Sequence, residues 1–370
     1  MTGTDTTPPD DLPYEQVLRI LRGAVAAGAS DIHLKVNGSP RVRIHGKLCP
    51  LDHPPLEEEA VQTAVGALAS VARVPVERLS GKQVDFSCAL PEVGRFRVHA
   101  YRQGGAVAVA LRHIPAKVPD FVSLRIPPVV KRIVAEDRGL VMVTGATASG
   151  KSTTIAAMLE YIGQKLPRQV VTIEDPIEHI FEDGVASFVQ REVGRDVDSY
   201  EQGLAGVLRE DPDVVYVGAI RSPMEFDIAL NAAESGRLVL STSHAADTDR
   251  AISHMLSFYP RDYRDGVRHR LADVLVGILS QRLVPKSQAS EKILVTEVLT
   301  RAPAVTECVR DPSRQKSLAT ALESATSEYG CHSFEQTLRT LVKDKHISLD
   351  TAKANARNAT DFARSLSGIR

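Results

Sequence analysis

Hydrophobic residues follow two different periods in the first third of the chain. They recur every three or four positions over residues 14–27, which predicts a helix that ends at Gly28. Residues 31–36 and 41–45 instead alternate between apolar and polar, and Asn37-Gly38 between them favours a hairpin. Both patterns return later in this part, as a helix and three strands at 56–72, 84–89, 94–101 and 107–112. We therefore expect a small α+β domain over residues 13–113.

The pattern changes after a stretch rich in proline. Pro115, Pro119, Pro127 and Pro128 interrupt any period, so we assign residues 114–128 to a linker that acts as a hinge. Beyond it, uniformly apolar strands alternate with helical patterns, which indicates an α/β domain over residues 129–370. Strands are expected at 139–144, 169–173, 214–217 and 238–242, and helices at 129–135, 199–208, 226–234, throughout 249–282, and from the caps Ser333 and Ser348.

The strand at 139–144 leads into the segment with the clearest chemistry. Gly145 and Gly150 are separated by four residues and followed at once by Lys151 and Ser152, which is the Walker A pattern. Its glycines let backbone N–H groups converge on a polyphosphate, and the dipole of the following helix adds to the attraction. Lys151 is expected to reach the β- and γ-phosphates of ATP, and Ser152 is expected to bind Mg²⁺. The residues assigned to the nucleotide are Gly145, Ala146, Thr147, Ala148, Ser149, Gly150, Lys151, Ser152 and Thr153.

Charged residues near the ends of other strands allow two interpretations each, one structural and one functional. Arg95, Arg97 and Arg112 are either solvated residues of an edge sheet or, with Arg95 and Arg97 on one face, a grip on the phosphates of a neighbouring subunit's nucleotide. The acidic run at 174–178 is either a helix-capping turn or a group placed for Mg²⁺ and an attacking water. His244 is either structural or a sensor of the γ-phosphate.

The overall composition excludes several other classes of protein. A net charge of −1 and a pI near 6.8 give no global attraction to nucleic acid or to an anionic membrane. The four cysteines share no C-x-x-C spacing, so neither a zinc site nor a disulfide framework is indicated. Residues 1–12 are acidic and polar, unlike a signal peptide, and are expected to be disordered. No apolar run approaches the roughly 20 residues of a membrane span, so we expect a cytoplasmic protein without direct membrane insertion.

Taken together, these segments resemble the secretion ATPase superfamily, and within it the type IV pilus retraction ATPase family of PilT/PilU-like proteins. The resemblance extends over nearly the whole chain after residue 13. Residues 29–34 resemble the family's N-terminal motif, 94–98 its arginine strand, 172–178 its Asp box, 208–218 its Walker B segment, 232–238 the segment after it and 242–244 its His box, and 280–283 also fit.

The resemblance implies a fold, an assembly and partners. The fold would be a RecA-like P-loop ATPase domain preceded by a PAS-like α+β domain, assembled as a hexameric ring with nucleotide between the two domains. Glu178 would take part in hydrolysis, and the arginine strand would contribute to the site. Domain rotation driven by ATP would turn an inner-membrane pilus platform protein and extract pilin, at the cytoplasmic face of that membrane. The extra N-terminal domains and four-cysteine zinc insert of assembly-type relatives are missing, which favours the retraction branch.

One departure from the family concerns catalysis directly. Ala219 stands where the family has the Walker B glutamate that polarises the attacking water. Loss of a positioned general base lowers a rate on the order of 10²–10⁴-fold and leaves the phosphate cradle unchanged. Glu178 is then the remaining candidate for activating water.

Other departures lie close to the same nucleotide site. Ala146 and Ala148 replace the usual proline and glycine of the loop, Ser222 replaces an aspartate, and Ser243 replaces a leucine. Such clustering favours a naturally degenerate paralogue over an engineered variant. The sequence therefore predicts an ATP-driven pilus retraction motor with slow hydrolysis, or alternatively a non-catalytic, ATP-binding regulatory paralogue of a PilT-like motor. An assembly or secretion ATPase is a weaker third reading.

Overall fold

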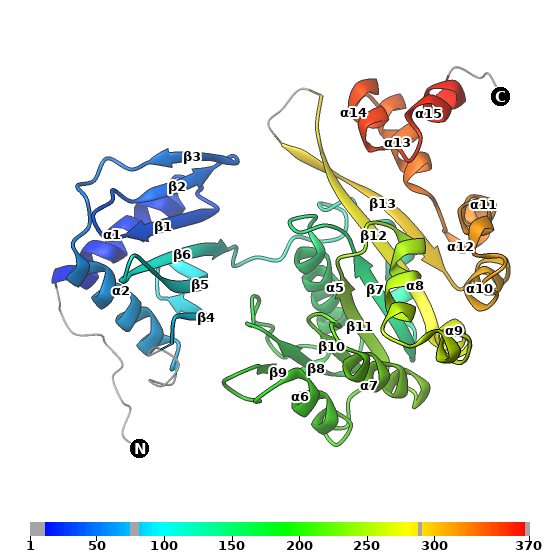
Figure 1. Ribbon diagram of the computed structural model, residues 1–370, viewed down its shortest axis with the longest axis horizontal. Coiled ribbons are helices and arrows are strands. Elements are labelled where there is room, and N and C mark those ends of the chain that lie inside the picture. Colours follow the sequence, from blue (N-terminus) through cyan, green and yellow to red (C-terminus); the bar gives the residue numbers. More distant parts are fainter. Residues whose placement is uncertain (1–11, 75–80, 288–290, 367–370) are drawn as a thin grey trace. The chain divides into compact units, whose positions relative to one another are not determined.

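The structure, a computed structural model, describes residues 12–74, 81–287 and 291–366 (Figure 1). Contacts within it define two compact units that divide between Lys117 and Val118, and the short segment Asp175–Ile180 groups with unit 1. The domain bounds and the hinge expected from the sequence stay predictions. Residues 1–11, expected to be disordered, lie outside the described residues, and the first helix begins at Leu12.

Unit 1 is a six-stranded antiparallel sheet with helices on one face. Its strand order is β3-β2-β1-β6-β5-β4. Leu21 and Leu68 of the two helices are fully buried in one core with Ile32 and Phe86 of the strands. Its elements are α1 (Leu12–Ala26), β1 (Asp31–Lys35), β2 (Arg41–Ile44), β3 (Lys47–Pro50), α2 (Glu58–Val71), β4 (Gln83–Leu90), β5 (Gly94–Gln103) and β6 (Ala106–Ile114).

The hairpin of unit 1 agrees with the sequence pattern. β1 and β2 pair antiparallel with Ile32 opposite Val42, and Asn37 in the turn has a positive φ of 57°. The sequence did not predict β3, because this strand is short, lies at the edge of the sheet and is largely exposed. Short edge strands carry little of the alternation that a buried face imposes.

Unit 2 is built on a seven-stranded sheet in the order β13-β12-β7-β11-β10-β8-β9. The strands from β12 to β9 run parallel, and β13 pairs antiparallel with β12. Its strands are β7 (Gly139–Thr144), β8 (Gln169–Glu174), β9 (Ser187–Glu192), β10 (Val214–Val217), β11 (Leu238–Ser243), β12 (Leu275–Pro285) and β13 (Lys292–Thr300). Its helices are α4 (Val129–Ala135), α5 (Lys151–Lys165), α6 (Tyr200–Val207), α7 (Pro223–Glu234), α8 (Thr248–Ser257), α9 (Arg264–Val274), α10 (Pro303–Arg310), α11 (Leu318–Ser324), α12 (Thr326–Tyr329), α13 (Phe334–Lys343), α14 (Leu349–Asn355) and α15 (Ala359–Leu366).

Helices cover both faces of this sheet (Figure 1). On one face α4 and α5 pack against Val141 and Val143 of β7. On the other face α7, α8 and α9 pack against Leu140 and Met142, while α6 packs on β8 and β10. Successive strand residues point to opposite faces, so a strand covered on both sides needs an unbroken apolar run. The expected fold class, an α/β P-loop ATPase domain preceded by an α+β domain, is confirmed.

The last three helices, α13 to α15, form a small group that we call the C-terminal lobe. Phe334 and Leu338 of α13 pack with Val284 and Ile293 at the ends of β12 and β13. Ser333 caps α13 through a reciprocal capping box with Gln336. The expected cap of α14 by Ser348 is also present, since its side chain accepts a hydrogen bond from the Thr351 N–H.

Part of one expected helix is a strand. Residues 249–282 were expected to be helical throughout, but the helices α8 and α9 end at Val274 and residues 275–285 form β12. The run Leu275-Val276-Gly277-Ile278-Leu279 is buried on both sides, and a short apolar run has no period that separates a strand from a buried helix. Pairing with β7 and β13 decides the outcome. Strands β9 and β13 were not predicted either.

Candidate nucleotide-binding site

The phosphate loop lies at the carboxyl end of β7, between β11 and β12. All six residues of β7 are buried, and the loop 145–150 connects it to α5, whose N-cap is Gly150. After α5 the chain returns to the sheet in β8, three strands from β7, whereas β12 lies on the other side. The order of the strands thus extends from β7 in both directions. Ligands of open α/β sheets bind at the carboxyl ends of the strands where the order reverses in this way. The topology therefore supports a ligand site at residues 145–150.

Two glycines allow the loop to fold where it does. Gly145 has a φ of +147°, and a Cβ there would lie 2.5 Å from the Gln281 carbonyl oxygen and 2.6 Å from Ser149 Oγ. Gly150 has a φ of +92° at the start of α5. Ala148 also has a positive φ, of 62°, although it carries a Cβ. The backbone therefore requires glycine at Gly145 for space and at Gly150 for conformation, and it strains Ala148.

The loop gathers groups that suit a polyphosphate. Lys151 Nζ donates to the carbonyl oxygens of Gly145 (2.8 Å) and Ala146 (3.0 Å), and burial lowers the pKa of Lys151. Ser149 Oγ is buried and has no hydrogen-bond partner among the described residues. A cation, an unpaired hydroxyl and the N-terminus of a helix together fit an anionic ligand. Ser152, expected to bind Mg²⁺, is exposed in the first turn of α5.

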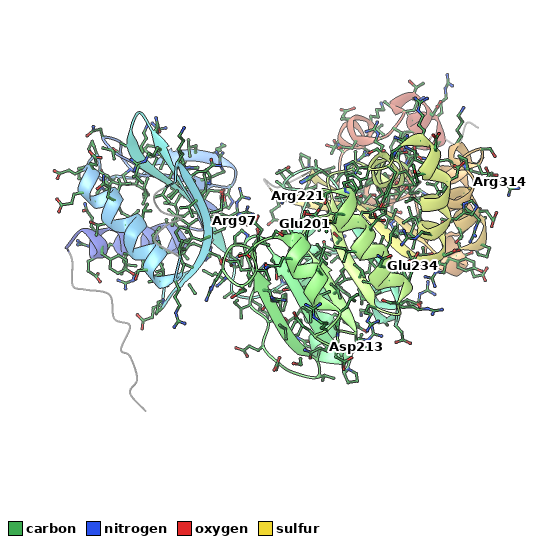
Figure 2. The ribbon with its side chains drawn as sticks, turned by 60° about the horizontal axis from the view of Figure 1, so that its bottom comes forward. Arg97, Glu201, Asp213, Arg221, Glu234 and Arg314 are labelled. Atoms are coloured by element: carbon green, nitrogen blue, oxygen red, sulfur yellow. The ribbon has the colours of Figure 1, made fainter. Side chains whose placement is uncertain are left out.

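Further cationic side chains meet at this edge of the sheet. His244 follows β11, and its pKa is lowered by burial and then by the positive charges of Lys151, Arg221 and His254. Arg221 lies where the chain leaves β10 for α7, at the other end of that strand from Asp213 (Figure 2). The side chains that act electrostatically on His244 thus come from three other segments of unit 2. An anion would relieve their mutual repulsion.

The position of the missing Walker B carboxylate is buried. Ala219 follows β10 and is 9% exposed, and the neighbouring Gly218 oxygen accepts a hydrogen bond from Thr242 Oγ1 at 2.6 Å. Glu174 ends the adjacent strand β8, where Ile173 pairs with Val217, so this carboxylate lies next to Gly218 along the carboxyl edge. It accepts hydrogen bonds from Thr172 Oγ1 (2.8 Å) and Gln190 Nε2 (3.2 Å). The sequence analysis included Glu174 in the acidic run 174–178, and the role of that run toward Mg²⁺ or water stays a prediction.

The arginine strand and the Asp box meet within unit 1. Arg95 Nε and Nη2 donate to the carbonyl oxygens of Glu178 (2.6 Å) and Ile177 (2.7 Å), and Arg97 Nη1 contacts Glu178 Oε1 at 3.1 Å. Arg112 faces Arg97 across β5 and β6 but donates from Nε to Asp31 Oδ1 at 2.9 Å. Arg95 and Arg97 therefore share a face, as period two requires. The roles of Glu178 and of the three arginines toward a nucleotide stay predictions.

A buried glutamine beside the loop was not assigned from the sequence. Gln281 on β12 is 1% exposed, and its Nε2 donates to Thr154 Oγ1 of α5 at 2.7 Å. Its Oε1 has no partner among the described residues, and Gln281 lines a cavity of about 220 Å³ together with Gly150, Thr153 and Thr154. The segment 280–283 matched the family pattern, but no chemical role followed from that match.

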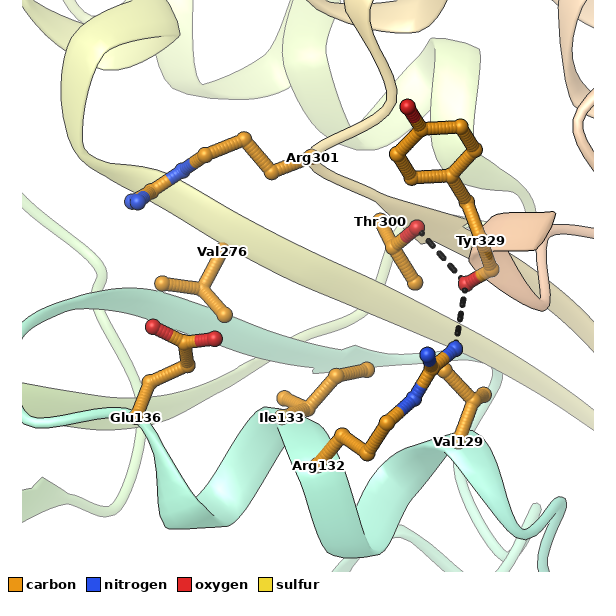
Figure 3. Close-up of a pocket in the computed structure, with 8 residues that line it drawn as sticks. All are labelled: Val129, Arg132, Ile133, Glu136, Val276, Thr300, Arg301 and Tyr329. Carbon is orange, nitrogen blue, oxygen red and sulfur yellow. Dashed lines mark hydrogen bonds between the residues drawn. The ribbon is translucent and has the colours of Figure 1, made fainter.

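A second cavity, whose lining residues are drawn in Figure 3, lies at the amino end of β7. It has a volume of about 160 Å³ and opens beside the start of β12 and the end of β13. Arg132 Nη2 and Thr300 Oγ1 both donate to the Tyr329 carbonyl oxygen, at 3.1 Å each. A Cβ on Gly139, the first residue of β7, would touch Val276 of this cavity, which places it at the amino end of the strand. It is therefore separate from the phosphate loop.

Two absences concern only the part of the chain that the structure describes. Over residues 12–74, 81–287 and 291–366 there is no helix with the length and apolar character needed to cross a membrane. Within the same residues no three His, Cys, Asp or Glu side chains are grouped so as to hold a metal ion.

Comparisons with known proteins agree with this geometry. Residues 9–365 match the family described as Type II/IV secretion system protein. The chain is 32% identical to the type IV pilus ATPase PilU of Pseudomonas aeruginosa, over 95% of this chain and 90% of the relative. It is 33% identical to the retraction ATPase PilT of the same organism, over 94% of this chain and 99% of the relative. A crystal structure of the pilus retraction motor PilT with bound ADP superimposes with a TM-score of 0.85 and 37% identity, covering 94% of this chain and 99% of that one.

Proposed function

Because the chain belongs to the Type II/IV secretion system protein family, we propose that it is an ATP-driven motor of the type IV pilus retraction type, which acts in twitching motility. The observation that carries this proposal is the phosphate loop with its cationic surroundings. Lys151 is the first residue of α5, its charge and that of Arg221 lower the pKa of His244, and the buried Ser149 hydroxyl in the loop has no hydrogen-bond partner among the described residues. The likeness to a retraction motor that binds ADP supports the same function.

The ligand that we assign to the loop is ATP with Mg²⁺. Main-chain N–H groups of residues 145–153 and Lys151 would hold the phosphates, and Ser152 would provide an oxygen ligand to the metal. Mg²⁺ would supply neutralisation of the phosphate charge. The cavity lined by Gln281 and Thr153 is large enough to accept part of the nucleotide beyond its phosphates.

We further propose a hexameric assembly that works on a membrane partner. Arg95, Arg97 and Arg112 would act on the nucleotide of a neighbouring subunit, which makes hydrolysis depend on the ring. Binding and hydrolysis would be coupled to domain rotation about residues 114–128. The partner would be an inner-membrane pilus platform protein, with this chain peripheral at the cytoplasmic face. A paralogous PilT-like ATPase is proposed as a second partner. No role with nucleic acid is proposed.

Hydrolysis is proposed to be slow because Ala219 supplies no carboxylate. Glu178 would take over activation of water, although its carboxylate is paired with Arg97 here. The burial of Ala219 beside Gly218 also favours the alternative function, a non-catalytic regulatory paralogue that binds ATP without turning it over. The two functions share the phosphate site and differ only in turnover.

Phosphate release and nucleotide titration with the purified chain separate these functions. We expect slow release by the wild-type chain, none by Lys151→Ala, and a rate raised on the order of 10²–10⁴-fold by Ala219→Glu. Lys151→Ala should also lose binding of an ATP analogue. A wild-type rate equal to the Lys151→Ala background, with nucleotide still bound, would leave only the regulatory function. Calorimetry that detects no binding of Mg²⁺ and an ATP analogue would end both proposals.

A further inference from the structure

A buried carboxylate joins the C-terminal lobe to the segment that carries His244. Glu297 on β13 is 0% exposed. Its Oε1 accepts hydrogen bonds from the Thr248 N–H (3.0 Å) and from Thr248 Oγ1 (2.7 Å), at the first residue of α8. Its Oε2 accepts a hydrogen bond from Arg357 Nη2 at 2.9 Å, in the connection between α14 and α15. One carboxylate therefore holds the start of α8 on one side and the lobe on the other.

The start of α8 lies close to His244 along the chain. His244 directly follows β11, and only three residues separate it from Thr248. Asp247 caps α8 by accepting a hydrogen bond from the Arg250 N–H at 2.9 Å. The short connection is thus anchored at the end of β11 and at the start of α8, so a shift of Thr248 is transmitted to residues 245–247, which directly follow His244.

The lobe also contacts β12, at the residue next to Gln281. The Arg282 guanidinium lies 4.0 Å from the ring centroid of Phe334, and its Nη1 donates to the Asn355 carbonyl oxygen at 2.6 Å. The preceding residue, Gln281, points to the opposite face of the sheet, where its side chain donates a hydrogen bond to Thr154 of α5. The lobe therefore contacts β12 at the residue next to Gln281, and it reaches the start of α8, close to His244, through Glu297.

We propose that Arg357 is a positioning residue for His244, through which the C-terminal lobe controls the nucleotide site by way of Glu297 and Thr248. This inference rests on the proposed ATPase function. Removal of the guanidinium would leave a fully buried carboxylate without its hydrogen-bonded counter-charge, and such a group takes up a proton. A protonated Glu297 would hold Thr248 less strongly, because hydrogen bonds to a charged acceptor are the stronger ones.

The consequence is a specific dependence on pH. Burial raises the pKa of Glu297, Arg357 opposes that shift, and Asp247, the N-cap of α8, adds to it. Among the described residues, Arg282 of β12 also interacts with Glu297, and Glu335 of α13 accepts a hydrogen bond from the Arg357 N–H through its Oε1 at 2.9 Å. Without the Arg357 guanidinium the pKa of Glu297 rises further. The carboxylate that anchors Thr248 is then lost as the pH falls through that raised pKa, and with it the placement of His244.

The test compares Arg357→Ala with a matched control in the same lobe. Arg339 of α13 has a side chain 35% exposed, against 37% for Arg357, and its weak ion pair at 4.0 Å reaches Glu323 instead of the nucleotide site. Phosphate release is measured between about pH 6 and pH 8, a range that spans the titration of strongly raised carboxyl groups. We expect Arg357→Ala to lose at least about fivefold in rate from the upper to the lower end of that range, relative to wild type. Arg339→Ala should follow the wild-type profile.

Two further variants distinguish a positioning role of Arg357 from a general loss of stability. Arg357→Lys keeps a positive charge and should restore most of the wild-type profile. Adding Glu297→Gln to Arg357→Ala replaces the titrating carboxyl by an amide, so the extra dependence on pH should disappear even if the rate is low. Hydrogen exchange at the amides of residues 244–250, measured without nucleotide, should accelerate in Arg357→Ala and remain unchanged in Arg339→Ala.

The outcomes separate this inference from the proposed function. A wild-type rate, pH profile and exchange pattern in Arg357→Ala would overturn the positioning role, as would an equal effect of Arg339→Ala. A wild-type chain that releases no phosphate above the Lys151→Ala background would instead overturn the motor function. The exchange measurement, which needs no turnover, then still decides whether Arg357 holds the start of α8.

Discussion

Two alanines of the phosphate loop differ in backbone conformation. Ala148 has a φ of 62°, in the left-handed region, whereas Ala146 is not among the residues with positive φ. A Cβ in the left-handed region costs about 1–2 kcal/mol, while glycine in an ordinary conformation loses about 0.5–1 kcal/mol through the entropy of the unfolded chain. The same change to glycine should therefore have opposite effects two residues apart.

We expect Ala148→Gly to raise the free energy of unfolding by about 0.5–1 kcal/mol and Ala146→Gly to lower it by a similar amount. Both variants remove one methyl group at an exposed position of the same loop, so a difference between them reflects the backbone conformation of each position. Urea unfolding of the two variants and the wild type measures the difference. Stabilisation by neither substitution would contradict the strain assigned to Ala148.

The protonation of His244 should respond to a bound nucleotide. In the structure its pKa is lowered by burial and by Lys151, Arg221 and His254, so the neutral imidazole is favoured near neutrality. A polyphosphate beside it would raise that pKa, and a ligand that raises a pKa binds with proton uptake. The affinity for an ATP analogue should then increase as the pH falls from about 7.5 to about 6, around the ordinary histidine pKa.

Calorimetry in two buffers with different ionisation enthalpies measures this proton uptake. His244→Asn is the control, because it keeps a polar side chain and removes the titration, while any contribution from the phosphate groups themselves remains. Equal proton uptake by the wild type and His244→Asn would show that His244 does not face the phosphates.

At the scale of the element, α7 shows how one departure from the family pattern is accommodated. Ser222 Oγ accepts a hydrogen bond from the Glu225 N–H at 3.2 Å, and Glu225 Oε2 accepts from the Ser222 N–H at 3.0 Å. This reciprocal capping box satisfies two N–H groups at the start of the helix. Serine and aspartate cap helices about equally well, so Ser222 in place of aspartate need not weaken α7.

The cap of α7 can be tested by two substitutions. Ser222→Ala is expected to lower the free energy of unfolding by about 1 kcal/mol, because the side-chain acceptor is lost. Ser222→Asp restores the residue usual in the family and should stay within about 0.5 kcal/mol of wild type. Thermal or urea unfolding provides the measurement. A strongly destabilised Ser222→Asp would mean that the site needs the smaller hydroxyl, not merely a cap.

At the scale of the whole molecule, the proposed function requires more than one chain. Arg112 has a side chain 63% exposed even though its Nε bonds Asp31, so its guanidinium remains accessible to another subunit. If such arginines act on a neighbour's phosphates, nucleotide should stabilise the assembly, because a ligand that binds only the assembled form shifts the equilibrium by mass action.

We therefore expect ATP analogues with Mg²⁺ to promote a particle of six times the 40.1 kDa chain mass. Light scattering or sedimentation over a range of protein concentrations measures it. Lys151→Ala should not respond to nucleotide, and Arg112→Ala should assemble less readily than wild type. A chain that stays monomeric at every nucleotide and protein concentration would contradict the ring.

Much of the architecture could be predicted because it depends on patterns of residues that are close along the chain. The apolar run 139–144, the Walker A spacing and the glycines after it specify strand, loop and helix within a few residues, and the structure has β7 and α5 there. Where local patterns are weak, prediction failed. β3 is a short exposed edge strand, and β12 is an apolar run without a period, so pairing with other strands decides both.

The sequence by itself determined the fold class, the family and the position of the loop between β7 and α5, because each depends on residues that are close along the chain. Only the tertiary structure decided which distant side chains complete the site. Gln281 reaches Thr154 across 127 residues, and Arg357 reaches Glu297 across 60. The period of the apolar residues does not predict such pairs. How the strands and the C-terminal lobe pack determines whether the Gln281 amide and the Glu297 carboxylate are buried. The physical reason is that spacing specifies backbone conformation, whereas the partners of a buried polar group are specified by packing.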